Sequence, residues 1–170
     1  PYKMVNGRKS YAFSVNVNVS SIDKSVNAYE GKIIFPTAIL EVVSISKNGS
    51  IVGLWAEEPT FSNATGEISF SGVTLNPGFI GKDAKVLRID FKPKHSGTAK
   101  LTIKEASVLA NDGSGTNVLT NAEGATITLV AADKTSPVET SGQITESSII
   151  TSSSHPAQNE WYPETNAYLS

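Results

Sequence analysis

The chain contains no cysteine among its 170 residues. Disulfide bonds, thiolate nucleophiles and cysteine-ligated metal sites are therefore excluded, and the redox compartment stays open. Charged residues are also few, at 18%, and the net charge of −2 provides no basic surface for a nucleic-acid backbone or an anionic membrane. We therefore expect no nucleic acid among the partners.

Long apolar runs are missing as well. The longest, residues 31–40 and 51–56, are far shorter than the roughly 20 residues of a membrane-spanning helix. No basic-then-apolar leader follows Pro1, so we expect a signal peptide to have been removed or to lie outside this fragment. A hydrophobic fraction of 39% in 170 residues is enough for one buried core, which predicts a single domain with a tail.

Apolar and polar residues alternate along most of the chain, which is the pattern of half-buried strands. Residues 12–20 alternate in this way, beginning with Phe13. In residues 26–35, Ile33 falls on the face opposite to Glu30, Lys32 and Ile34. Further strand-like runs are residues 40–46, 51–56, 67–73, 85–91, 99–103, 107–110 and 125–130.

Turn signals separate these runs. The turn Lys47-Asn48-Gly49-Ser50 lies between residues 40–46 and 51–56, and Asn-Gly between apolar runs predicts that the two pair as a hairpin. Residues 63–66, 76–78 and 111–115 also read as turns. Eight or nine short strands, with no ten-residue helical period, predict an all-β, antiparallel sandwich and exclude a parallel α/β fold.

The composition changes after the sandwich, which we place at residues 1–132. Residues 133–158 are rich in Ser and Thr and too polar to fold, which predicts a disordered linker. Residues 159–170 are aromatic again, and we interpret them as the truncated start of a following module. The alternative is that these aromatic residues pack back on the sandwich.

No catalytic constellation is visible in the sequence. His95 and His155 lie in turn and linker sequence, without the spacing of a metal site or a catalytic triad. Glu57 and Glu58 are adjacent, and adjacent side chains of a strand point to opposite faces, so they cannot flank a glycosidic bond. We therefore expect no enzyme activity.

A calcium site is a weaker alternative at Asn111, Asp112 and Asn117, which offer oxygen ligands among glycines. The spacing of a calcium loop and its distal bidentate Glu are absent, so a plain turn is favoured and no other cofactor is expected. Three matches to the N-glycosylation acceptor carry little weight in a chain this rich in Asn, Ser and Thr: Asn18-Val-Ser20, Asn48-Gly-Ser50 and Asn63-Ala-Thr65.

Trp55 has two interpretations. Exposed Trp rings stack on sugars, but a sugar-binding face needs more than one ring, and the other aromatic residues of the sandwich fall mostly on inward positions. Core or rim packing is therefore favoured for Trp55. The face that carries Glu30, Lys32 and Ile34 mixes polar and apolar residues, as protein interfaces and ordinary solvated faces both do.

Several segments resemble the cohesin family. Residues 26–43, V-N-A-Y-E-G-K-I-I-F-P-T-A-I-L-E-V-V, are similar to a cohesin strand that leads through a Pro-containing corner into a short strand. Residues 86–91 with 94–101 resemble the next conserved cohesin segment, and residues 106–119 resemble a cohesin hairpin turning at Asp-Gly. The resemblance covers roughly residues 10–131, whereas the entry into the first long strand, residues 7–13, departs from the cohesin pattern.

The resemblance implies a jelly-roll sandwich that docks dockerin-bearing proteins through one sheet face and has no chemistry of its own. More narrowly, the chain is similar to cohesin-domain proteins of uncultured small-genome bacteria, in which a linker and Ig-like modules follow. We therefore expect an extracellular or cell-surface scaffold module with a binding site at Glu30, Lys32, Ile34 and Trp55. A polysaccharide-binding module and a passive spacer are the alternatives: a row of outward aromatic rings would favour sugar, and a flat mixed face would favour protein.

Overall fold

The computed structural model describes residues 3–5, 8–10, 12–130 and 165–169, which contain eleven strands and no helix. None of these residues therefore forms a helix long and apolar enough to cross a membrane. The strands are β1 (Lys3–Val5), β2 (Arg8–Ser10), β3 (Phe13–Ile34), β4 (Leu40–Ser46), β5 (Leu54–Ser62), β6 (Glu67–Val73), β7 (Phe79–Pro93), β8 (Gly97–Ala110), β9 (Ala122–Glu123), β10 (Ala125–Leu129) and β11 (Thr165–Leu169).

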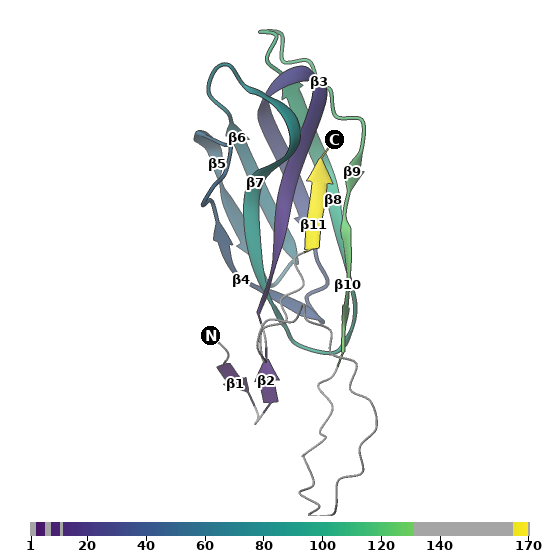
Figure 1. Ribbon diagram of the computed structural model, residues 1–170. Coiled ribbons are helices and arrows are strands. Elements are labelled where there is room, and N and C mark those ends of the chain that lie inside the picture. Colours follow the sequence, from purple (N-terminus) through teal and green to yellow (C-terminus); the bar gives the residue numbers. More distant parts are fainter. Residues whose placement is uncertain (1–2, 6–7, 11, 131–164, 170) are drawn as a thin grey trace, which may run out of the picture.

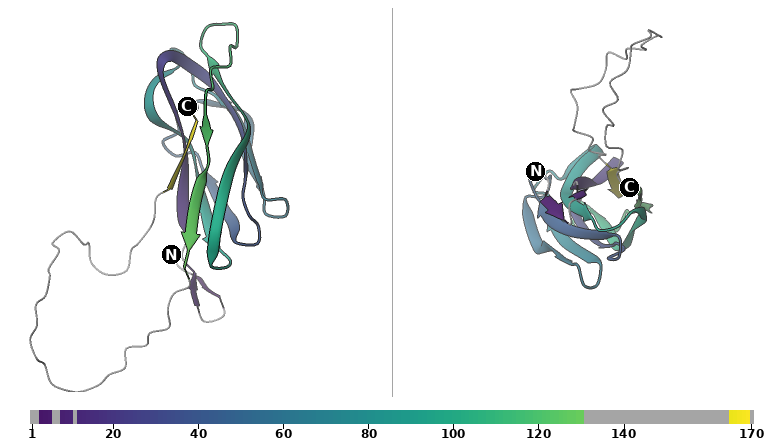
Figure 2. Two further views of the ribbon diagram at one scale, coloured as in Figure 1. Left: turned by 90° about the vertical axis from the view of Figure 1, so that its right-hand side faces the viewer. Right: turned by 90° about the horizontal axis from the view of Figure 1, so that it is seen from below.

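Strand β3 belongs to both layers of the sandwich. It is 22 residues long and bends over one end of the molecule, so that its two halves run down opposite layers (Figure 1). Residues 13–21 pair with β7 and β11, and residues 28–34 pair with β6 and β8. One layer is therefore β5–β6–β3–β8–β10 and the other is β4–β7–β3–β11–β9. Seen from below, the strands form a nearly closed ring (Figure 2).

The core lies between the two layers and is built by alternation along each strand. Phe91 is fully buried, with its ring stacked on Phe13 at 5.8 Å and edge-on to Phe35 at 5.6 Å between ring centroids. The predicted inward residues of the first two runs and of residues 85–91 are all buried: Phe13, Val15, Val17, Val19, Tyr29, Gly31, Ile33, Phe35, Leu87, Ile89 and Phe91. The predicted all-β sandwich is therefore confirmed, and so are the inward faces that alternation assigned to these runs.

The predicted hairpin between residues 40–46 and 51–56 is wrong. The turn itself forms, since the Ser50 N–H donates to the Lys47 carbonyl at 3.0 Å and Gly49 has a φ of 69°. However, β4 pairs with β7 and β5 pairs with β6, in the opposite layer. The Ile51 N–H donates to the Lys85 carbonyl at 2.9 Å, so the chain after the turn follows β7 while it crosses between layers. The Asn-Gly turn reverses the direction of the chain, whereas the packing of the two layers determines which strands pair.

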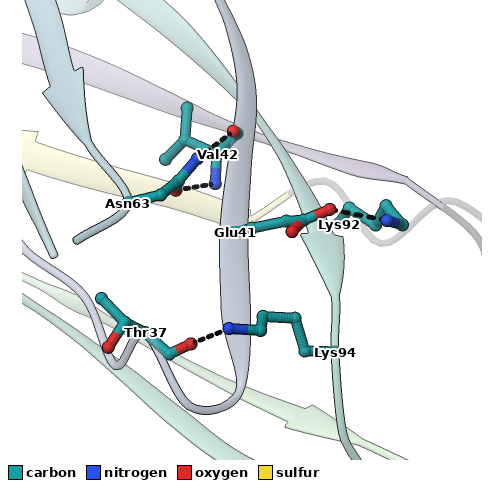
Figure 3. Close-up of polar contacts among 6 residues, drawn as sticks. All are labelled: Thr37, Glu41, Val42, Asn63, Lys92 and Lys94. Atoms are coloured by element: carbon teal, nitrogen blue, oxygen red, sulfur yellow. Dashed lines mark hydrogen bonds and ion pairs between the residues drawn. The ribbon is translucent and has the colours of Figure 1, made fainter.

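The true hairpin joins β5 to β6 through residues 63–66, one of the predicted turns. Gly66 has a φ of 75°, and its N–H donates to the Ser62 carbonyl at 2.8 Å. The side chain of Asn63 reaches across to β4, where its Oδ1 accepts from the Val42 N–H at 2.8 Å and its Nδ2 donates to the Val42 carbonyl at 2.9 Å (Figure 3). This side-chain amide makes the two hydrogen bonds to Val42 that a neighbouring strand would make, and it links β4 to the turn after β5 in the other layer.

Residues 165–169 form β11 in the sandwich itself. They pair in parallel with residues 15–19 of β3, and Tyr168 and Leu169 pair antiparallel with β9. The backbone of these five residues thus pairs with the sandwich, whereas the interpretation of residues 159–170 as the start of a following module stays a prediction. The predicted linker, residues 133–158, lies outside the described residues.

Candidate functional site

The outer face of β5, β6, β3 and β8 carries three of the four predicted binding residues, and we call it the β3–β6 face. On β6 the inward residues Ile68, Phe70 and Gly72 are buried, which turns the alternate residues outward. By the pairing registers, the outward positions of the four strands are Leu54, Glu57, Thr60, Ser62, Glu67, Ser69, Ser71, Val73, Ala28, Glu30, Lys32, Ile34, Thr102, Lys104, Ser107 and Leu109. The face is therefore a nearly even mixture of small hydroxyl, charged and aliphatic side chains.

Three of the four predicted binding residues, Glu30, Lys32 and Ile34, lie side by side on this face. Lys32 Nζ forms an ion pair with Glu105 Oε2 at 2.8 Å. Glu105 comes from an irregularity in β8, where the pairing with β3 shifts between Glu30 and Lys32 and the φ of Glu105 is 50°. This bulge lets Glu105 reach a residue of the neighbouring strand. Glu105 could not be predicted as a site residue, because nothing in the local sequence signals the bulge.

Three carboxylates act on the charge of Lys32. The hydrogen bond and the negative charge of Glu105 raise the pKa of Lys32, and the carboxylates of Glu67 and Glu57 add to this effect. In return, the hydrogen bond and charge of Lys32 lower the pKa of Glu105. Lys32 is therefore a cation held among three carboxylates, and its replacement by an acid would change the charge of this face sharply.

Hydroxyl groups in the middle of the face are hydrogen-bonded to neighbouring side chains. The Ser69 hydroxyl donates to Glu57 Oε1 at 3.2 Å and lies 3.1 Å from the Thr60 hydroxyl. Glu58, the neighbour of Glu57, points the other way and pairs with Lys47 Nζ at 2.6 Å. The two carboxylates of the acidic doublet thus diverge, as predicted. Leu54 adds an apolar group that is 59% exposed.

Trp55, the fourth predicted binding residue, is not part of this group. It pairs with Gly72, an inward position of β6, and packs against the core. A Cβ atom at Gly72 would lie 3.0 Å from Trp55 Cε3, so the indole occupies the space that a side chain would need. Lys47 Nζ lies 5.9 Å from the centre of the ring. The indole therefore packs at the rim of the core, and the β3–β6 face carries no row of aromatic rings among the described residues.

The turn at residues 111–117 uses its oxygen atoms internally. Asp112 Oδ2 accepts from the Thr116 hydroxyl at 2.6 Å and Asp112 Oδ1 accepts from the Ser114 N–H at 2.9 Å. Asn117 Oδ1 accepts from the backbone, whereas Asn111 Nδ2 donates to the Pro77 carbonyl at 2.9 Å. In the part of the chain that the structure describes, no group of three or more acidic or histidine residues is placed to hold a metal ion.

The opposite outer face, on β4, β7 and β3, is built around Asp90. Its carboxylate accepts from the Ser14 hydroxyl at 2.8 Å and the Ser44 hydroxyl at 2.7 Å, and it lies 3.1 Å from Arg88 Nε. Partial burial raises the pKa of Asp90, but these hydrogen bonds and the Arg88 charge together hold it below its usual value. This carboxylate therefore links three neighbouring strands.

Asp90→Asn is expected to lower stability at neutral pH. Because the folded-state pKa of Asp90 is depressed, its contribution is present above the unfolded pKa of about 3.9 and is lost as the pH falls through the folded value. The difference in free energy of unfolding between wild type and Asp90→Asn should therefore narrow from about pH 5 to about pH 2. Urea unfolding across this range measures it, and a difference that stays constant with pH would contradict the role of the charge.

Comparison with known proteins adds to this geometry. The family description "Cohesin domain" matches residues 4–127, whereas no curated protein matches the chain. A solved structure of CaCohA2 of Clostridium acetobutylicum is similar, with 16% identity, a TM-score of 0.54, and coverage of 69% of this chain and 99% of that one. The seventh ScaB type I cohesin of Pseudobacteroides cellulosolvens has 17% identity and a TM-score of 0.53, with coverage of 77% of this chain and 99% of that one. The sixth scaffoldin B cohesin of Acetivibrio cellulolyticus, in complex with a dockerin mutant, has 12% identity and a TM-score of 0.51, with coverage of 71% of this chain and 99% of that one. At these identities the likeness shows a shared fold.

Proposed function

Since the chain belongs to the cohesin family, we propose that it is a non-catalytic docking module that binds a dockerin-like protein through the β3–β6 face. The structure of the Acetivibrio cellulolyticus relative is a complex with a dockerin. The observation that carries the proposal here is that Glu30, Lys32 and Ile34 lie together on one outer sheet face beside small hydroxyl groups. Protein interfaces combine such aliphatic anchors with polar groups at the rim.

A polysaccharide ligand is the main alternative, and the position of Trp55 counts against it. Stacking on a sugar needs ring faces open to solvent, whereas this indole packs against Gly72 and the core. A passive spacer needs no ligand at all, and a binding survey separates it from the other two functions. As part of the same proposal, we place the module outside the cell or on its surface, without a calcium requirement of its own.

Lys32→Glu is expected to weaken dockerin binding about tenfold or more, because it would place a fourth carboxylate beside Glu57, Glu67 and Glu105. The matched control is Lys92→Glu, which breaks an ion pair of 2.6 Å with Glu41 on the opposite layer. That control should leave the affinity unchanged. The measurement is a titration of the full chain and both variants against a panel of purified dockerins, with a glycan array in parallel.

The outcomes separate the three functions. A dockerin that binds the wild-type chain and Lys92→Glu equally, but binds Lys32→Glu weakly, supports the proposal, and the added change Glu105→Lys should recover part of the affinity. Saturable glycan binding that is lost in Trp55→Ala would replace the proposal with the carbohydrate function. Absence of binding to either panel would favour the spacer.

A further inference from the structure

Strand β11 fills a gap between two strands that do not pair with each other. Residues 15–19 of β3 pair with β11 on one side, and Ala122 and Glu123 of β9 pair with it on the other. In Figure 1 the yellow β11 lies between the purple β3 and the green β9, in the layer opposite to the β3–β6 face. We call the space that β11 occupies the β3–β9 slot.

Without β11, the slot would expose two strand edges. The edge of β3 between residues 15 and 19 would carry unpaired N–H and C=O groups, which is the situation that promotes strand addition from another chain. The inward side of this stretch is fully apolar, since Val15, Val17 and Val19 are completely buried. An extended segment that enters the slot therefore completes both a hydrogen-bond ladder and the cover of the core.

The stretch of β3 beside β11 has unpartnered polar atoms, and the ladder of β11 is short. Asn16 and Asn18 lie on the part of β3 that pairs with β11, and the Oδ1 atom of each is buried without a hydrogen-bond partner. Asn18 is only 7% exposed. Pairing with β3 is parallel, which is slightly weaker per residue than antiparallel pairing, and pairing with β9 extends over two residues. The ladder that holds β11 is therefore shorter and weaker than the antiparallel ladders that join β3 to β6, β7 and β8.

The chain between β10 and β11 is long enough to reach another molecule. Residues 131–164 separate β11 from the described end of the sandwich at Val130. At roughly 3.3 Å per residue this length of chain can span on the order of 100 Å when extended. A strand on so long a connection is free to pair within its own chain or with a second copy.

We propose that the β3–β9 slot is a strand-exchange site, in which residues 165–169 of a second copy replace β11 and join two chains. The slot accepts this segment in the structure itself, so the occupant from another copy is chemically identical to the one already seen. Exchange is governed by concentration, since a tethered strand competes at an effective concentration of about millimolar. The slot is on the layer opposite to the β3–β6 face, so exchange leaves that face open.

The first test uses a labelled peptide of residues 160–170 and the double variant Asn166→Pro, Ala167→Pro. Successive residues of a strand direct their N–H groups to opposite sides, so two adjacent prolines break the pairing with β3 in either register. The double-proline chain should bind the peptide about 100-fold more tightly than the wild-type chain, whose own strand competes. The same two prolines in the peptide should abolish binding, and prolines at Ser152 and Ser153 of the chain are the matched control.

Binding of the peptide to neither chain, or to both chains equally, would overturn the proposal. A second measurement does not depend on the double-proline chain being folded. The wild-type chain is unfolded in urea, refolded at about millimolar concentration and diluted, and its mass is measured by size exclusion with light scattering. A dimer that decays slowly to monomer, and that is absent after the same treatment of the double-proline chain, is the expected result. Monomer alone after refolding at every concentration would contradict strand exchange.

Discussion

Replacing Phe91 with Ala is expected to lower the free energy of unfolding by about 3–5 kcal/mol. Phe91 is fully buried near the C-terminal end of β7 and contacts two further rings, Phe13 and Phe35. Phe13 comes from the first half of β3, and Phe35 follows the end of the second half, so the cavity would open where the two layers meet. A loss of this size is a large share of the 5–15 kcal/mol by which typical domains are stable.

Urea or thermal unfolding of the Phe91→Ala chain measures this loss. The matched control is Phe61→Ala on the edge strand β5, because the side chain of Phe61 is 41% exposed. That change removes the same atoms and should cost about 1 kcal/mol or less, since less apolar surface is withdrawn from water in the folded state. Equal losses for the two variants would mean that Phe91 is not at the centre of the core.

The second large effect is expected for Asn63→Ala, at about 2–4 kcal/mol. The Asn63 side chain satisfies both the N–H and the carbonyl of Val42, which is 3% exposed (Figure 3). Removal of the amide leaves two backbone groups near the core without a partner, and each such group costs about 1–3 kcal/mol. Because Glu41 and Lys92 remain paired beside it, the loss should be local to the contact between β4 and the turn after β5.

Asn63→Asp separates the two hydrogen bonds. The carboxylate still accepts from the Val42 N–H, but it faces the Val42 carbonyl without a proton to donate. This arrangement raises the pKa of the new carboxyl group, so its charge destabilises the fold at neutral pH and the penalty is relieved as the pH falls through that pKa. Unfolding of both variants at about pH 7 and about pH 4 tests this. A stability difference from wild type that is the same for both variants at both pH values would show that the donor to Val42 is unimportant.

Much of the fold could be predicted from alternation alone. Residues 12–20, 26–35 and 85–91 were assigned their inward faces from the period of two, and those faces are buried. This works because a strand with one face on the core must place apolar residues at every second position, and one slip of register would expose them all. The resemblance to cohesins likewise gave the family that matches residues 4–127.

Strand partners could not be predicted in the same way. The Asn-Gly turn at residues 48–49 is a strong hairpin signal, yet the strands on either side pair with β7 and β6. A turn sequence encodes a reversal of the chain, whereas pairing depends on hydrogen bonds to residues far along the sequence, such as that between Ile51 and Lys85. Asn63 could not be predicted for the same reason. The sequence around it indicates a turn, whereas its side-chain amide bonds the backbone of Val42 on β4.

For the candidate site, the sequence by itself determined that Glu30, Lys32 and Ile34 share the face opposite to Ile33, because alternation is a local property of the backbone. Only the tertiary structure decided what surrounds them. Glu105 reaches Lys32 through a bulge in β8, Trp55 packs inward against Gly72, and β11 enters the layer beside residues 15–19. These contacts join residues far apart in the chain, and they are fixed by how two layers share one core rather than by any local pattern.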